Sequence, residues 1–557
     1  MTEGEAAVEA CCAGTTPRRV VLVALIVCAA VSVASRYAKE MLSDYRFERD
    51  ARQHVWWMYK WSDPELFPDD PAFRFFSLPI FAPVGYQAVY RVLVPFADAQ
   101  HVSEVVPIVL VALTVAACFA CFSKWCGGRW LAPAVGSLLL VGLFVRYFRG
   151  GIPRVFALPV VAAFAWLSTS RRVWPLGLGL LLAVLFYPPP VIVLGLTSLV
   201  VIYWRWRRGD VGVPDLCGYA ALTVAAAGLF LACYVVGKPD WIGPRPTREQ
   251  YRTMAEFRYH PGEGRGRSAV FGKSFRGYWI KSERTGFGSR GRRVLRLLTA
   301  CLVVLALRRF RDPVPVFLPG LAGSALLMFA ASHLLMPMLF YPNRHVQAPL
   351  IIVCVGLTAV VLCRLTEAAC RRWPELVPLG RRIWWVLPVT IVAYATYRGV
   401  QGVEKARELG PPHPSIVALM DFCRSTPKDT LFAGLPYAMD NIPFLAQRSV
   451  LAAHEHTMPH YLGYYAIMRS RMEDEFRLLY ATSWEDATAT AARHGVDYVV
   501  VPVNLLDPDR PYYHPPVGRL ERELRQRASE EGAAMLDPPL GRCVLSTGRY
   551  RVVDVRP

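Results

Sequence analysis

The stretch Val20–Ser35, VVLVALIVCAAVSVAS, decides the class of this protein because it carries no charge and is bounded by Arg19 and Arg36. About 20 mostly apolar residues span a membrane as a helix, and flanking cations that snorkel to the interface allow fewer. Similar stretches recur along the chain, and 54% of its 557 residues are hydrophobic. The sequence therefore predicts a polytopic α-helical membrane protein with about 11 transmembrane helices, at roughly 20–35, 105–122, 130–145, 155–168, 174–188, 190–204, 215–236, 294–307, 314–340, 347–366 and 382–398.

The basic residues of the short loops predict the orientation, because Lys and Arg there resist translocation. With residues 1–19 as a cytoplasmic tail and 20–398 as the multi-span domain, the loops 36–104 and 237–292 and the region 399–557 lie outside. Two outside segments, Arg146–Arg154 and 237–292, carry cations against this rule. Such cations indicate either an anionic ligand or a solvated loop, and the composition leaves both open.

Residues 399–557 have mixed charge and no stretch long enough to span a membrane. Alternating helix-like and strand-like patterns predict a C-terminal extracytoplasmic α/β domain. We expect helices at Pro414–Cys423 and Trp484–His494, the second ended by Gly495. Strands are expected at residues 430–433, 496–501, 542–546 and 550–555.

Several function classes are excluded or disfavoured. The net charge of +20 comes largely from basic clusters at cytoplasmic helix ends, which anionic lipid headgroups explain, and no nucleic-acid-binding motif accompanies it. No Gly-x-x-x-x-Gly-Lys-Ser/Thr sequence occurs, which argues against ATP-driven transport. Most Cys residues lie within predicted spans, and a disulfide between Cys423 and Cys543 is left open without support from spacing.

A histidine-rich stretch in the C-terminal region, His454-Glu455-His456 with His460, suggests metal ligands at first sight. In a zinc-binding helix two His stand four residues apart with Glu directly after the first. Here the second His follows too soon, and Pro459 separates His456 from His460. We therefore expect a loop that faces the membrane domain and contacts the acceptor of a transferred group.

The first outside loop opens with the segment ERDARQHVWW, residues 48–57, which delivers two acids to the membrane surface. If a helix begins near Asp50, His54 lies one turn later on the same face. Glu48 and Asp50 would serve catalysis, or they would cap an interfacial helix anchored by the aromatic residues that follow. Asp69-Asp70 is a second, weaker acidic candidate.

This outline resembles the GT-C superfamily of integral-membrane glycosyltransferases, which includes oligosaccharyltransferase catalytic subunits and protein mannosyltransferases. The resemblance rests on a first span, an outside loop with Glu48-Arg49-Asp50, many further spans and a terminal α/β domain. It implies transfer of a sugar from a polyprenyl-phosphate-linked donor to an acceptor, with inversion. It also implies catalytic roles for Glu48, Asp50 and His54, and Glu48 and Asp50 as ligands of a divalent cation such as Mg²⁺ or Mn²⁺.

Glycosyl transfer from a lipid phosphate independently requires a base for the acceptor and cations for the leaving phosphate. Asp50 is our candidate for the base, and His54 for an orienting or phosphate-binding partner. Three sets of cations are candidates for the phosphate: Arg344 with His345 beside Pro342, Arg154 with Arg146 and Arg149, and the basic loop with Lys273, Arg276, Lys281 and Arg284.

Two other function classes stay open. A transporter or flippase would use the intramembrane charges as a path for a lipid-linked or anionic substrate, although no inverted repeat is evident. A noncatalytic envelope-assembly protein would share the same architecture. We expect an integral protein of a bacterial inner (plasma) membrane, with membrane lipids and a polyprenyl-phosphate-sugar donor as partners and no nucleic acid.

Overall fold

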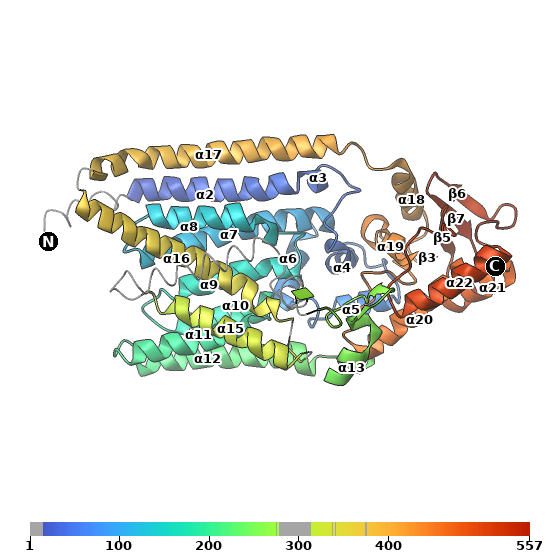
Figure 1. Ribbon diagram of the computed structural model, residues 1–557, viewed down its shortest axis with the longest axis horizontal. Coiled ribbons are helices and arrows are strands. Elements are labelled where there is room, and N and C mark those ends of the chain that lie inside the picture. Colours follow the sequence, from blue (N-terminus) through green and yellow to red (C-terminus); the bar gives the residue numbers. More distant parts are fainter. Residues whose placement is uncertain (1–14, 275, 278–313, 337, 340, 374–375) are drawn as a thin grey trace.

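The computed structural model describes residues 15–274, 276–277, 314–336, 338–339, 341–373 and 376–557. It consists of a long bundle of apolar helices with an α/β domain at one end, and short helices of the first loop lie between the two (Figure 1). The hydrophobic core is continuous across this junction, since one cluster of buried residues includes Leu25 and Val355 of the bundle and Val499 of the α/β domain. The α/β domain is therefore packed onto the bundle.

The bundle helices follow the apolar stretches of the sequence. Within the described residues, five helices are long and apolar enough to cross a membrane, four further apolar helices are shorter, and a tenth, long helix packs beside the first. Their side chains that face out of the bundle are apolar as well, among them Val109, Leu199 and Val224, as a lipid environment requires. The helices are α2 (Thr15–Arg36), α7 (Ala99–Trp125), α8 (Leu131–Phe144), α9 (Ala157–Leu167), α10 (Trp174–Phe186), α11 (Val191–Trp206), α12 (Val213–Leu231), α15 (Phe317–Leu334), α16 (Asn343–Arg372) and α17 (Leu376–Glu408).

Ten of the predicted apolar stretches coincide with these helices in the described part of the chain. The stretch 294–307 lies outside the described residues. The polytopic helical class is therefore confirmed, while the total of about 11 spans and the domain boundaries at residues 19 and 398 stay predictions.

Short elements connect the bundle to the α/β domain. Aromatic side chains of the first loop, including Trp56, Trp57 and Phe76, are fully buried between the two parts. The first loop contains α3 (Ala38–Met41), α4 (Ala51–His54), η1 (Trp56–Trp61), α5 (Pro71–Phe76) and α6 (Val84–Leu93). Short turns at η2 (Val145–Tyr147) and η3 (Pro153–Phe156) join bundle helices, and η4 (Ala232–Val236), η5 (Asp240–Ile242), α13 (Arg248–Thr253), η6 (Ala255–Phe257), β1 (Tyr259–His260) and β2 (Gly264–Arg265) follow α12.

The α/β domain contains a five-stranded mixed sheet in the order β4-β3-β5-β7-β6. Strand β3 runs parallel to β4 and β5, whereas β7 runs antiparallel to β5 and β6. The central strand β5 is wholly buried, as its apolar run predicts. The elements are α18 (Pro414–Ser425), β3 (Leu431–Gly434), α19 (Pro436–Met439), η8 (Ile442–Ala446), β4 (Ser449–Val450), α20 (Leu462–Leu479), α21 (Trp484–His494), β5 (Tyr498–Pro502), α22 (Val517–Glu531), β6 (Cys543–Ser546) and β7 (Tyr550–Asp554).

The local sequence signals of this domain predicted where several of its helices and strands begin and end. Ser483 accepts a hydrogen bond from the Asp486 amide and begins α21, and Gly495 ends it with a φ of 69° that favours glycine. The expected strands are found within about two residues of their predicted bounds. Cys423 is buried and Cys543 is exposed, and both are free thiols.

Candidate active site

The two acids of the first loop meet two arginines of the turn between α8 and α9. Arg149 donates from Nε to a carboxylate oxygen of Glu48 at 2.8 Å, and Arg154 donates from Nη2 to Asp50 at 2.6 Å. The structure thus brings the predicted acidic pair together with one of the three predicted cation sets. Hydrogen bonds of this length between ionised groups are strong, charge-assisted contacts.

Two glycines let the turn approach the acids. Gly150 and Gly151 have φ values of 68° and 55°, in the left-handed region that side chains disfavour. A Cβ atom on Gly150 would lie 2.6 Å from the Glu48 side chain, and one on Gly151 would lie 2.3 Å from the Tyr90 hydroxyl. The Gly-Gly pair is therefore what allows Arg149 and Arg154 to flank the acidic segment, which we define as residues 48–54.

Asp50 precedes α4 directly, and His54 ends it. Partial burial raises the pKa of Asp50, but the charge of Arg154 and the hydrogen bond that it donates outweigh that effect and hold the pKa below its usual value. Asp50 is therefore ionised at neutral pH. Its carboxylate is still 43% exposed, which leaves room for a second partner.

His54 is the neutral member of this group. Burial of the imidazole lowers the pKa of His54 to about 3. The charge of Asp50 opposes this shift without overcoming it, and the charges of Arg154 and Arg344 act in the same direction as burial. The ring stacks on Phe81 with centroids 4.8 Å apart. Its Nδ1 atom is buried and has no hydrogen-bond partner within the described residues. A neutral ring of this kind offers a hydrogen bond without adding charge.

A small pocket opens beside the acidic segment. Arg154 and Arg344 lie in its wall with the polar side chains of Tyr147, Tyr187 and Gln347. The rest of the wall is apolar, formed by Val155, Ala157, Leu158 and Ala348. We call it the arginine pocket; its composition suits a molecule with an anionic head and an apolar body.

Arg344 enters the pocket from the first turn of α16. It forms no ion pair with any carboxylate in the described part of the chain, in contrast to Arg149 and Arg154. A half-buried guanidinium without a carboxylate partner is a ready binding site for an external anion.

The other predicted phosphate ligands lie elsewhere. His345 is buried in the bundle at 1% exposure and does not line the arginine pocket. Lys273 places its amino group over the Tyr259 ring at 4.1 Å, and Arg276 is exposed. Lys281 and Arg284 lie outside the described residues. Their roles as phosphate ligands stay predictions, whereas Arg154 and Arg344 converge on one pocket.

Across the described ranges no three His, Cys, Asp or Glu side chains gather as metal ligands. Glu48 and Asp50 each face a guanidinium group, which repels a cation from the same oxygens. The metal role predicted for these two carboxylates remains a prediction, and no step below depends on it.

The histidines of the C-terminal region have separate partners. His454 shares a hydrogen bond with the Tyr513 hydroxyl at 2.8 Å, and His460 with the Tyr341 hydroxyl at 3.2 Å. His456 stacks on Trp56 of the first loop. The loop therefore faces the membrane domain, as expected, without forming a metal cluster.

The second acidic candidate has a structural task. Asp70 caps α5 and accepts hydrogen bonds from the amides of Ala72 and Phe73 at 2.7 and 3.2 Å. Asp69 is exposed and has a φ of 49°. Neither lines the arginine pocket.

Sequence reasoning missed several residues near the site. Tyr147, Tyr187 and Gln347 complete the arginine pocket, and Arg52 and Gln53 connect the acidic segment to the α/β domain. Tyr147, Arg52 and Gln53 lie in the segments Arg146–Arg154 and 48–57 that the sequence singled out, but nothing in those segments marked them as site residues. The others carry no local signal, because the wall of a pocket between helices depends on tertiary packing.

Comparisons with known proteins identify solved structures that share the fold of this chain. No protein-family model matches the chain, and no curated protein matches it in sequence. Among solved structures, ArnT from Cupriavidus metallidurans bound to undecaprenyl phosphate superimposes with a TM-score of 0.51. The match covers 98% of this chain and 99% of that one at 13% identity. This chain shares the fold of that ArnT structure.

Two further structures extend the comparison. ArnT of the same organism in its apo state gives a TM-score of 0.50 at 13% identity, over 95% of this chain and 97% of that one. The oligosaccharyltransferase AglB from Archaeoglobus fulgidus, in complex with an inhibitory peptide and a dolichol-phosphate, gives 0.43 at 12% identity over 87% and 69%. The resemblance expected from the sequence is thus confirmed for the fold, which spans the bundle and the α/β domain together.

Proposed function

We propose that this protein is a membrane glycosyltransferase that takes a sugar from a polyprenyl-phosphate-linked donor and transfers it to an acceptor on the outer face of the membrane. The observation that carries the proposal is that Arg344 and Arg154 line one pocket and that Arg154 also binds the ionised Asp50. The fold shared with an ArnT structure that holds undecaprenyl phosphate supports the same class of donor.

In this proposal the arginine pocket binds the donor. Arg344 and Arg154 hold the phosphate, since guanidinium groups bind phosphate oxygens through paired hydrogen bonds. The apolar wall of Val155, Leu158 and Ala348 receives the first isoprene units, and the remaining chain stays in the lipid. The tyrosine hydroxyls of Tyr147 and Tyr187 supply hydrogen bonds around the head group.

The chemical step is a displacement at the anomeric carbon. The acceptor oxygen forms a bond to that carbon while the bond from carbon to the phosphate oxygen breaks, and the phosphate leaves with the electron pair. Asp50 takes the proton from the acceptor hydroxyl as a general base. Attack opposite the leaving group inverts the configuration at the sugar carbon.

Arg154 has two partners in this scheme. In the structure it neutralises Asp50, which makes the carboxylate a weak base. A bound donor phosphate competes for the same guanidinium and adds negative charge nearby, so both effects raise the pKa of Asp50. Donor binding therefore activates the base. Glu48, held by Arg149, fixes the turn that presents Arg154.

The direct test is transfer by the purified protein in lipid nanodiscs, with a panel of radiolabelled polyprenyl-phosphate-linked sugars. We expect at least one donor in the panel to release free polyprenyl phosphate, and only when an acceptor hydroxyl is present. The configuration at the anomeric carbon of the transferred sugar should be inverted. Movement of an intact lipid-linked sugar across the bilayer without bond cleavage would favour the transporter or flippase instead. Binding without either reaction would favour the noncatalytic assembly protein.

The orientation has a test of its own. Reporter fusions after Ser103, Lys238 and Pro411 should report the outer side, and fusions after Lys124, Arg207 and Arg372 the cytoplasm. Together these fusions bracket both large loops and the α/β domain. A cytoplasmic signal after Pro411 would place the acidic segment on the wrong side for an outer-face transferase.

A further inference from the structure

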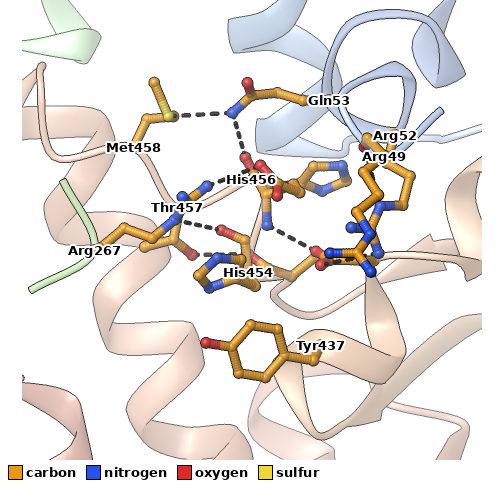
Figure 2. Close-up of polar contacts among 12 residues, drawn as sticks. Arg49, Arg52, Gln53, Arg267, Tyr437, His454, His456, Thr457 and Met458 are labelled. Atoms are coloured by element: carbon orange, nitrogen blue, oxygen red, sulfur yellow. Dashed lines mark hydrogen bonds and ion pairs between the residues drawn. The ribbon is translucent and has the colours of Figure 1, made fainter. Parts of the chain in front are cut away.

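The acidic segment is held by the α/β domain as well as by the bundle. Figure 2 shows Arg52 and Gln53 reaching from the first loop towards the loop of His454, His456 and Met458. Gln53 donates from Nε2 to the Glu455 carbonyl at 2.6 Å. Arg52 Nη1 lies 3.3 Å from the Asn441 carbonyl oxygen Oδ1 and 3.5 Å from the Asp440 carboxylate.

The two faces of α4 have different partners. Residues four apart share a helix face, whereas a residue two positions away lies on the opposite side. Asp50 and His54 face Arg154 and the arginine pocket, and Arg52 between them faces the α/β domain. Helix α4 has four residues, too few to hold its shape without tertiary contacts. Its partners on both faces therefore set where Asp50 lies.

Asp440 is the most enclosed of these partners. Its side chain is 0% exposed, against 15% for Arg52. One carboxylate oxygen accepts the Glu455 amide at 2.7 Å, which leaves the other towards Arg52. Arg267 closes the network from the segment after α12, because it binds the Glu455 carboxylate and the His454 carbonyl, each at 3.0 Å (Figure 2).

We propose that Asp440 is a positioning residue for transfer: through Arg52 it fixes α4, so that the α/β domain places Asp50 at the arginine pocket. This inference rests on the proposed function, since it assigns the α/β domain a part in the same reaction. Asp440 touches neither the pocket nor the reacting atoms, so it acts on α4 through Arg52 and, by way of the Glu455 backbone, through Gln53. Asn at position 440 still accepts the Glu455 amide, so Asp440→Asn tests the route through Arg52. A base displaced by about 1 Å can lose a factor of about 100 in rate.

The charge of Asp440 gives this contact a pH dependence. Burial raises the pKa of Asp440 to about 7, although the charge of Arg52 opposes the rise. The groups that face it are Arg52 of α4, Glu455 of the following loop and Arg267, together with Glu475 of α20, Tyr437 of α19 and Tyr513. Protonation weakens the attraction for Arg52, so turnover should rise with pH through about 7 and level off above it.

The effect on stability has the opposite sign. A carboxyl group whose pKa is raised in the folded protein binds more protons there than in the unfolded chain. The free energy of unfolding therefore falls as the pH rises from the unfolded pKa of about 4 to about 7. Asp440→Asn removes this ionisation, so at pH 8 the variant should unfold at no lower temperature than the wild type.

Asp474 supplies a matched control in the same domain. It is also a buried aspartate, and it binds His494 at 2.8 Å and Arg477 at 2.7 Å, away from the first loop. Burial raises the pKa of Asp474, but these two hydrogen bonds outweigh it and hold the pKa below its usual value. Asp474→Asn should therefore lower the unfolding temperature at pH 8 and leave turnover unchanged.

The experiment measures three quantities on the full-length protein in nanodiscs. Asp440→Asn should lower kcat about tenfold or more with little change in KM for the donor, and it should flatten the rise in turnover near pH 7. Hydrogen exchange of the amides at residues 51–55 should accelerate about tenfold in Asp440→Asn but not in Asp474→Asn. Arg52→Gln should lower kcat to the same extent as Asp440→Asn. The kcat of the double variant should be no lower than that of either single variant.

Each outcome decides a separate point. Unchanged exchange at residues 51–55 in Asp440→Asn would overturn the inference without any substrate. Normal kcat in Asp440→Asn, together with a large loss in Asp50→Asn, would also overturn it and leave the proposed function standing. Full activity in Asp50→Asn would instead contradict the proposed function itself.

Discussion

Two aspartate–arginine pairs flank the same short helix and differ in their surroundings. The side chains of Asp50 and Arg154 are 43% and 39% exposed, whereas those of Asp440 and Arg52 are 0% and 15% exposed. An exposed pair exchanges partners at small cost, but a buried pair that loses one member leaves an uncompensated charge. The Asp50–Arg154 pair is therefore suited to catalysis, in which a substrate must replace one partner. The Asp440–Arg52 pair is suited to fixing the position of α4.

The pKa directions follow the same division. Arg154 outweighs burial and lowers the pKa of Asp50, whereas burial outweighs Arg52 and raises the pKa of Asp440 to about 7. The same two residue types thus give a carboxylate that is ionised at neutral pH on one face of α4 and a group that titrates near neutral pH on the other. The environment, and not the residue type, assigns the role.

The largest expected effect is the loss of Asp50. Asn preserves the size of the side chain but accepts no proton, so Asp50→Asn should reduce transfer about a hundredfold or more while expression and membrane insertion stay normal. Initial rates with saturating donor and acceptor measure this effect. Glu48→Gln should be milder, because Glu48 acts through Arg149.

Asp69→Asn is the control in the same loop. Asp69 is exposed and has a φ of 49°, a conformation that Asn tolerates as well as Asp. Its transfer rate should equal that of the wild type. If Asp50→Asn kept full activity while Asp69→Asn lost it, the base would have to be sought further along the loop and the comparison of the two pairs would fail.

The next effect concerns the phosphate. Arg344→Ala removes a charge-assisted contact worth about 1.5–3 kcal/mol, so kcat/KM for the donor should fall roughly ten- to a hundredfold. Arg344→Lys should recover part of it, since the charge remains but the paired hydrogen bonds are lost. Donor titrations of the three proteins give the values. Unchanged turnover and donor affinity in Arg344→Ala would assign the phosphate to another cation.

A smaller effect separates the two aspartates by pH. The profile of kcat/KM reports the free enzyme and that of kcat reports the complex with substrate. In Asp440→Asn, where the rise near pH 7 is flattened, the remaining acid limb belongs to Asp50. Because the donor phosphate draws Arg154 from Asp50, this limb of kcat should lie about one pH unit above that of kcat/KM. Asp440 is remote from the pocket and contributes equally to both profiles. Coincident limbs would show that Arg154 stays with Asp50 throughout.

The sequence predicted the parts that local patterns encode. Apolar length gave the bundle helices, Gly495 gave the end of α21, and the spacing from Asp50 to His54 gave the single turn of α4. The choice among three cation sets was not predictable, because the Gly150–Gly151 turn and the start of α16 are far apart in sequence and meet only in the folded bundle. Asp440 carried no signal at all: its burial depends on the docking of two domains.

The smallest expected effect tests a third aspartate of the same loop. Asp70 is buried like Asp440, yet its carboxylate accepts two amides at the start of α5 and faces no arginine within 4 Å in the described ranges. Asp70→Ala should therefore lower the free energy of unfolding by about 1 kcal/mol, the usual value of a helix cap, and Asp70→Asn should keep most of it. Denaturation of the purified variants measures the difference, and kcat should stay at the wild-type value in both. A loss of transfer in Asp70→Asn with normal stability would mean that this carboxylate, too, takes part in the reaction.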